Sequence, residues 1–109
     1  LGDAGLAALL PALRRLPPLK HLDLAEINIG DEGVASLVAQ PTAGKLKSLK
    51  ELRLEHNQIT DAGCATLASA LRGGALPALK MLELDEYHGN PASQQGLDAV
   101  QAALSARSM

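Results

Sequence analysis

The stretch LKELRLEHNQITDAG, residues 49–63, fits neither a single amphipathic helix nor a single alternating strand. Leu52 and Leu54 are two residues apart, so they point to the same face of a short strand, while the charged residues beside them point to the other face. Asp61 is a favourable helix N-cap, and apolar residues follow it at helical spacing through Leu71. The stretch therefore predicts a short strand, a turn, and a helix that covers the apolar face of the strand.

The same pattern recurs along the chain. Segments that begin at Leu19, Leu49 and Leu79 start 30 residues apart and align over their leucines, and the first two also share Ile, Asp and Gly at matching positions. The third copy needs three extra residues, which place its glycine at Gly96, and a half copy, LGDAG, opens the chain. A fixed period of this length is the signature of a solenoid, in which each unit buries its apolar face against its neighbours.

We expect one domain over residues 1–109, divided into a half repeat and three full repeats: 1–18, 19–48, 49–78 and 79–109. Alternating strands and helices favour parallel βα units. The predicted strands are 22–24, 52–54 and 82–84, and the predicted helices are 3–15, 31–39, 61–71 and 95–106. Because the half repeat has a helix and no strand of its own, we expect an open edge there and interpret the chain as the C-terminal part of a longer one.

The motif LxxLxLxxNxI followed by xDxGxxxL resembles a leucine-rich repeat. The helical second half and the period resemble the ribonuclease-inhibitor-like class of that family. The resemblance implies a right-handed α/β solenoid, a short horseshoe arc with parallel strands on the concave side and helices on the convex side. In that family an asparagine turns inward and bonds the loop backbone. Asn57 matches it, whereas Ile27 and Tyr87 stand at the aligned positions, so we predict an interrupted asparagine series.

The composition limits the kinds of function. The chain has no Phe or Trp and a single Tyr, so its core must consist of aliphatic residues. A net charge of −2 and a pI of about 5.9 do not indicate nucleic-acid binding. The apolar runs are shorter than the roughly 18 residues of a membrane span, and no signal peptide is visible. The single cysteine excludes an internal disulfide and fits a reducing compartment, so we predict a cytoplasmic (intracellular) protein without membrane insertion.

The sequence offers no catalytic, cofactor or metal site. His21, His56 and His88 fall at different positions of the repeat, and Cys64 aligns with apolar residues in the other copies, which predicts a small core filler. The glycines do not form a phosphate-binding motif such as GxxxxGKS/T or GxGxxG after a strand. We therefore predict a protein that is not an enzyme and that needs no cofactor.

The outward positions of the predicted strands and the turns after them carry seven of the chain's twelve acidic residues and a single arginine. Arg53 is expected between Asp23 and Glu83 on the neighbouring strands, close enough to pair with both. One interpretation is a solvated surface, because exposed charges contribute little; the other is an acidic surface that binds a basic protein partner. The candidate partner-binding residues are Asp23, Glu26, Glu51, Arg53, Glu55, His56, Glu83, Asp85, Glu86 and Tyr87.

Two functional classes remain. The first is a non-catalytic protein–protein interaction module or structural subunit of a larger assembly, which binds through the strand face, the open N-terminal edge, or both. The second, implied by the resemblance alone, is the regulatory repeat region of a GTPase-activating protein or of an innate-immune-type receptor. The irregular segment EYHGNPASQQG in the last copy is typical of a terminal repeat that caps a solenoid, so we expect the C-terminal end to be closed.

Overall fold

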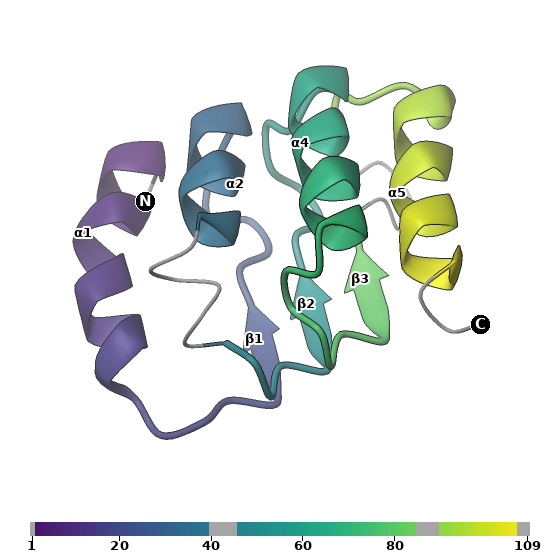
Figure 1. Ribbon diagram of the computed structural model, residues 1–109. Helices are drawn as coiled ribbons and strands as arrows, with labels where there is room; N and C mark the ends of the chain where they lie inside the picture. Colours follow the sequence, from purple (N-terminus) through teal and green to yellow (C-terminus); the bar gives the residue numbers. More distant parts are fainter. Residues whose placement is uncertain (1, 40–45, 85–89, 107–109) are drawn as a thin grey trace.

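The computed structural model describes residues 2–39, 46–84 and 90–106, in which helices and strands alternate (Figure 1). The elements are α1 (Gly2–Arg15), β1 (His21–Asp23), α2 (Asp31–Val38), β2 (Glu51–Arg53), α4 (Asp61–Arg72), β3 (Met81–Glu83) and α5 (Gln94–Ala106). Each helix begins and ends within one residue of its predicted bounds. Each strand begins one residue earlier than predicted, because the hydrogen-bonded ladder already starts at the Lys20 carbonyl, which accepts from Lys50 N–H at 2.8 Å.

The three strands form one parallel sheet in the order β1-β2-β3. Their register pairs Leu22 with Leu52 and Leu52 with Leu82, so equivalent repeat positions lie side by side. The helices form a second layer on one side of this sheet, in which α1 packs on α2, α2 on α4 and α4 on α5 (Figure 1). The arrangement confirms the predicted parallel strands and the α/β solenoid of stacked repeats.

An aliphatic core fills the space between the sheet and the helices. Leu52 and Leu54 of the middle repeat are fully buried, and Cys64 is buried in the same cluster, as the sequence predicts. Burial of one leucine side chain contributes roughly 1.5–3 kcal/mol. Leu22 is only half-buried, because β1 has no further strand on its outer side in the described sheet.

Asn57 ties the turn of its own repeat to the turn of the previous one. Its Oδ1 accepts from the backbone N–H groups of Ile27 and Ile29, both at 3.1 Å, and its Nδ2 donates to the carbonyls of Leu24 and Leu54 at 2.9 and 3.1 Å. The residue is only 2% exposed. The turn of the first repeat is therefore bonded by the asparagine of the next repeat, whereas Ile27 stands at the equivalent position of the first repeat itself.

Asn90 has the same role in the third copy, which corrects the interruption predicted there. Its Oδ1 accepts from the N–H groups of Asn57 and Ile59, both at 3.1 Å, and its Nδ2 donates to the carbonyl of Leu54 at 2.8 Å. The three extra residues of the third copy thus precede its asparagine, whereas alignment by the repeat period places Tyr87 at this position. Tyr87 lies outside the described residues.

Aspartates at the start of the helices link neighbouring repeats on the helix side. Asp31 Oδ1 accepts from Thr60 N–H at 2.8 Å, and Asp61 Oδ1 accepts from Ser93 N–H at 2.7 Å. The N-cap of α4 is Thr60, whose side chain accepts from Ala62 N–H at 3.3 Å, and not Asp61 as the sequence predicts. Asp61 is the first residue of its helix, and its carboxylate bonds the backbone that leads into the next helix instead.

Candidate functional site

The candidate site is the strand face, which consists of the outward side chains of β1, β2 and β3. These side chains alternate with the buried leucines, so they leave the sheet on the side opposite the helices. Asp23 of β1 is exposed, and Arg53 and Glu83, at the same height on β2 and β3, are half-buried. The structure thus brings three of the predicted residues into one row, with an acidic residue on either side of the arginine.

Arg53 forms its ion pairs along its own strand. Its Nε lies 2.6 Å from Glu51 Oε2, and its Nη1 lies 4.0 Å from Glu55 Oε2. The predicted pairs with the two neighbouring strands are not formed, which corrects the sequence interpretation. Asp23 Oδ1 instead accepts from Ala25 N–H at 3.0 Å, so the carboxylate that could reach Arg53 from β1 is held by its own turn.

Glu51 lies between two basic side chains. His21 Nδ1 is 3.4 Å from Glu51 Oε1, and Arg53 donates to the other carboxylate oxygen. The hydrogen bond from Arg53 lowers the pKa of Glu51, and the same bond raises the pKa of Arg53. Both groups are therefore charged at neutral pH and neutralise one another, so the free negative charge of the strand face comes from its other carboxylates.

Glu55 is buried, in contrast to the exposed position that alternation along the strand predicts. The residue is 7% exposed, and its Oε1 has no hydrogen-bond partner among the described residues. The chain turns directly after it, where His56 adopts a φ of 55° and Asn57 enters the core. Because its side chain is buried, Glu55 is not among the accessible contact residues.

Glu26 and His56 are exposed in the turns that follow β1 and β2. They occupy equivalent positions after β1 and β2, and both have positive φ angles, 60° and 55°, which the tight turn of the repeat requires. The remaining candidate residues, Asp85, Glu86 and Tyr87, lie outside the described residues, so their place on this surface stays a prediction.

A shallow hollow of about 300 Å³ lies on the strand face between β1 and β2. Its lining consists of His21, Leu22, Asp23, Glu51 and Arg53. The half-buried leucine contributes apolar surface, and the other side chains present polar groups around it. This combination suits a partner side chain that has an aliphatic stem and a polar head, such as lysine or arginine.

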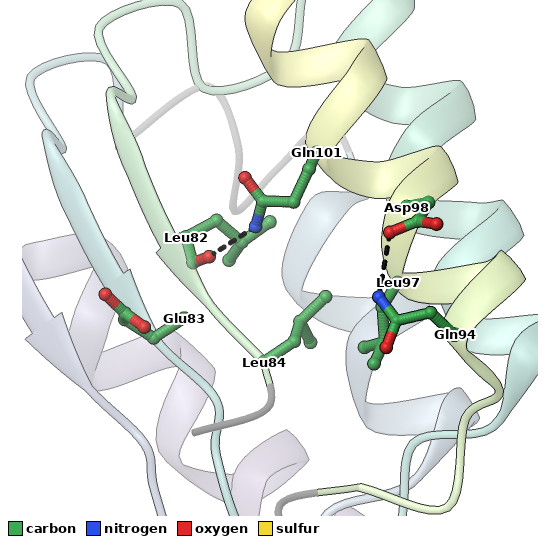
Figure 2. A pocket seen from close by; sticks show the side chains of 7 residues that line it. All are labelled: Leu82, Glu83, Leu84, Gln94, Leu97, Asp98 and Gln101. Atoms are coloured by element: carbon green, nitrogen blue, oxygen red, sulfur yellow. Dashed lines mark hydrogen bonds between the residues drawn. The ribbon is translucent and has the colours of Figure 1, made fainter. Parts of the chain in front are cut away.

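A second hollow, of about 180 Å³, lies at the C-terminal end of the stack between β3 and α5 (Figure 2). Gln101 reaches across it from α5, and its Nε2 donates to the Leu82 carbonyl at 2.9 Å. Gln94 Nε2 donates to Asp98 Oδ1 at 2.8 Å within the same helix. The polar groups of this hollow are thus largely bonded to one another.

Gln101 covers a backbone group on the outer edge of β3. The Glu83 carbonyl accepts from Leu54 N–H at 2.8 Å, so the alternating Leu82 carbonyl points away from β2. Sequence reasoning missed this contact, although a signal exists. Gln101 aligns with Ala68 of α4, which is 1% exposed, and a polar residue at a position that is buried and apolar inside the stack identifies a cap.

The side chains that could carry chemistry are dispersed. In the described ranges, no three His, Cys, Asp or Glu residues lie close enough to hold a metal ion. Cys64 is buried, and burial, together with the nearby Asp61 and Asp31, raises the pKa of its thiol to about 11, so it is not a thiolate at neutral pH. No helix in the part of the chain that the structure describes is long and apolar enough to cross a membrane.

Comparison with known protein families agrees with this geometry. The family model described as Leucine Rich repeat matches residues 15–38 and 45–68, and a search of curated proteins found no match. The first matched segment contains β1 and α2, and the second contains β2 and the first two turns of α4. The matches follow one another along the chain and coincide with consecutive strand–turn–helix units of the stack. The chain is a leucine-rich repeat protein.

Proposed function

We propose that this protein is a non-catalytic protein–protein interaction module that binds a partner with a basic surface through the strand face. Leucine-rich repeats generally mediate protein–protein interaction. The observation that carries the proposal is the charge of this face, where Asp23, Glu26 and Glu83 are at least partly exposed while Arg53 is neutralised by Glu51. Such a face attracts a basic partner over about one Debye length, roughly 8–10 Å, and speeds its association.

The spacing of the carboxylates favours a protein surface over a single small cation. Adjacent strands are about 4.8 Å apart, so Asp23 and Glu83, on the outer strands of one row, are separated by roughly 10 Å. Two cationic side chains on one face of a partner can engage both carboxylates. The hollow beside Leu22 adds apolar contact for the stem of one of them.

The proposal includes the finer features of the sequence interpretation. These are a right-handed horseshoe arc of the ribonuclease-inhibitor-like class with the strand face on its concave side, a single domain over residues 1–109 at the C-terminal end of a longer chain, and a cytoplasmic role as a subunit of a larger complex. A concave surface supports binding because it offers more contact area than a flat one.

Charge reversal tests the strand face. The variant Asp23→Lys/Glu83→Lys inverts the two carboxylates of the row, and Glu32→Lys/Asp98→Lys makes the same change of net charge at exposed residues of the helix layer. We expect association with a synthetic peptide rich in lysine and arginine to slow roughly tenfold in the first variant and to stay near the wild-type rate in the second. Stopped-flow fluorescence of labelled peptide measures both rates.

The outcome separates surface recognition from bulk charge. Equal slowing in both variants would mean that net charge alone controls binding, and an unchanged rate in the strand-face variant would contradict the proposal. Circular dichroism and the Tm of each variant show whether it is folded. Raising the salt concentration should slow the wild type more than the strand-face variant, because screening acts on the attraction that the variant has lost.

A further inference from the structure

One contact recurs at three successive interfaces between helices. Asp3 Oδ1 accepts from Gly30 N–H at 2.6 Å, and Asp31 and Asp61 make the equivalent bonds to the two later repeats. Each aspartate stands at the start of one helix and bonds the backbone that leads into the next. The series therefore runs in one direction, from each helix to the helix that follows it along the chain.

A glycine near the start of each receiving helix makes room for the carboxylate. At Gly33, Gly63 and Gly96, an added Cβ atom would lie 2.5, 2.3 and 2.4 Å, respectively, from the Oδ1 of the preceding aspartate. These distances are well inside a normal non-bonded contact, so a side chain there would displace the carboxylate. Because glycine is otherwise unfavourable in a helix relative to alanine, these three glycines mark the places where an aspartate enters.

Gly5 is a fourth glycine at this position of the repeat. It follows Asp3 by two residues, as Gly33 follows Asp31, and it is half-exposed in α1. The three aspartates of the series serve later helices, so the described part of the chain supplies Gly5 with no carboxylate from the series. Glycine lowers the stability of a helix relative to alanine, so a glycine at this position is useful only where an aspartate side chain enters. In α1 such an aspartate would have to come from a repeat in front of the half repeat.

The sheet is open at the same end of the stack. Lys20 and Leu24 direct their backbone groups to β2, where Lys20 accepts from Lys50 and Leu24 donates to Arg53. Backbone groups alternate along a strand, so those of β1 between these two residues that are not bonded to β2 point outward. In the described sheet β1 pairs with β2 alone, which leaves this outer edge ready to accept a parallel strand.

Apolar surface lies on both layers beside this edge. Leu22 is half-buried, whereas its equivalent Leu52 is fully buried. Within α1, every exposed residue between Asp3 and Arg14 is apolar: Ala4, Ala7, Ala8, Leu9, Pro11 and Ala12. Apolar patches of this kind mark interaction sites. The chemistry differs from that of the acidic strand face and resembles the interfaces between repeats inside the stack.

We propose that the N-terminal end of the stack docks one further leucine-rich repeat, parallel to the others and continuous with the chain, whose helix-start aspartate enters at Gly5. Its strand pairs with β1, its leucines cover Leu22, and its helix covers the exposed alanines of α1. This docking surface is separate from the strand face and does not depend on binding of a basic partner there, but it rests on the proposal that the chain is part of a longer one. It gives a specific contact to the expectation that the chain belongs to a longer solenoid.

An added repeat tests the proposal. A copy of residues 59–78 followed by a copy of residues 49–58, joined in front of Leu1, supplies a helix, a strand and a turn in the order that the stack requires. The extended chain should have a higher Tm than the 109-residue chain. Gly5→Ala should leave the Tm of the 109-residue chain unchanged or raise it, and should lower the Tm of the extended chain by about 5 °C. Removing the copied aspartate with Asp61→Ala in the extension should abolish that loss.

Gly63→Ala is the matched control, because its aspartate is present in both chains and the Tm should fall in both. If Gly5→Ala lowers the Tm of the 109-residue chain as much as Gly63→Ala does, the position is already filled and the proposal is wrong. An extension that fails to raise the Tm, or a loss at Gly5 that persists without the copied aspartate, also overturns it. Sedimentation equilibrium tests whether a second copy of the chain occupies this end instead of a further repeat. If the 109-residue chain forms a dimer and Gly5→Arg dissociates it, the surface belongs to a second copy and the proposal is wrong.

Discussion

The two ends of the stack are formed by α1 and β1 on one side and by α5 and β3 on the other (Figure 1), and they present different surfaces. At the N-terminal end, α1 exposes alanine and leucine and β1 has an open edge. At the C-terminal end, α5 exposes the polar side chains of Gln95, Asp98 and Ser105 as well as three alanines, and Gln101 bonds the Leu82 carbonyl (Figure 2). The inner positions are alike at both ends because the fold requires them, so a few outward residues decide whether a solenoid end is closed or open.

The aspartate series stops at one end and is incomplete at the other. Gln94 occupies in α5 the place that Asp61 occupies in α4, and its amide donates to Asp98 of its own helix instead of serving another repeat. Gly5 keeps the receiving position at the opposite end. The core leucines and the turn asparagines also differ between the middle and the ends of the stack. Each difference can be tested by mutating a residue inside the stack and its equivalent at an end.

The largest expected effect comes from the core leucines. Leu52→Ala should lower the free energy of unfolding by about 2–5 kcal/mol, because the side chain is fully buried and leaves a cavity. Leu22→Ala should cost roughly half of that or less, because Leu22 is half-buried at the open edge. Urea unfolding followed by circular dichroism measures both. Equal losses would mean that the N-terminal edge is as tightly packed as the middle of the stack.

The asparagines give the next largest effect. Asn57→Ala removes five hydrogen bonds to the backbone in a site that is 2% exposed, and we expect a loss on the order of 3 kcal/mol because an unsatisfied buried group costs about 1–3 kcal/mol. Asn90 makes equivalent bonds but is half-exposed, so water can replace its amide and Asn90→Ala should cost less. The same urea titration compares them, and a larger loss at Asn90 would contradict this reasoning.

The sequence predicted the fold well because each repeat position has one physical role. Leu52 and Leu54 had to share a buried face, and the period placed their equivalents in register across the sheet. The third asparagine was misplaced, since a fixed period carries no information on where an insertion falls. The bonds from the N–H groups of Asn57 and Ile59 identify Asn90 as the third asparagine.

The candidate site was less predictable, because side-chain pairing depends on geometry that spacing does not define. Alternation placed Arg53 in the correct row, yet the choice between carboxylates on its own strand and on neighbouring strands depended on Asp23 bonding its own turn. Glu55 follows the same alternation and is nevertheless buried, which spacing along the strand does not predict. Pattern therefore predicts which face a residue occupies, and packing decides what it contacts.

Cys64 lies in the middle of the stack, away from both ends, and the titration of its thiol tests how well the core there is protected from water. Burial raises the pKa of its thiol from an ordinary value of 9.0 to about 11, so the folded state holds this proton more tightly than the unfolded state does. Its contribution to stability is fully present below about pH 9 and is lost as the pH rises toward 11. The Tm of the wild type should therefore fall more steeply above pH 9 than the Tm of Cys64→Ala. Parallel slopes would show that the thiol gains no protection from folding.

The smallest effect, and the most direct test of the closed end, comes from Gln101. Gln101→Ala removes one hydrogen bond to the Leu82 carbonyl and should cost about 0.5–1.5 kcal/mol. It should also increase concentration-dependent self-association, because an uncovered strand edge offers its backbone groups to another chain. Gln95→Ala, at an exposed position of the same helix, is the matched control and should change the free energy of unfolding by less than about 0.5 kcal/mol. Thermal unfolding and sedimentation velocity at several concentrations measure both properties. If the two variants behave alike, the bond from Gln101 does not close this end, and the contrast with the open edge at β1 must come from the polar surface of α5 as a whole.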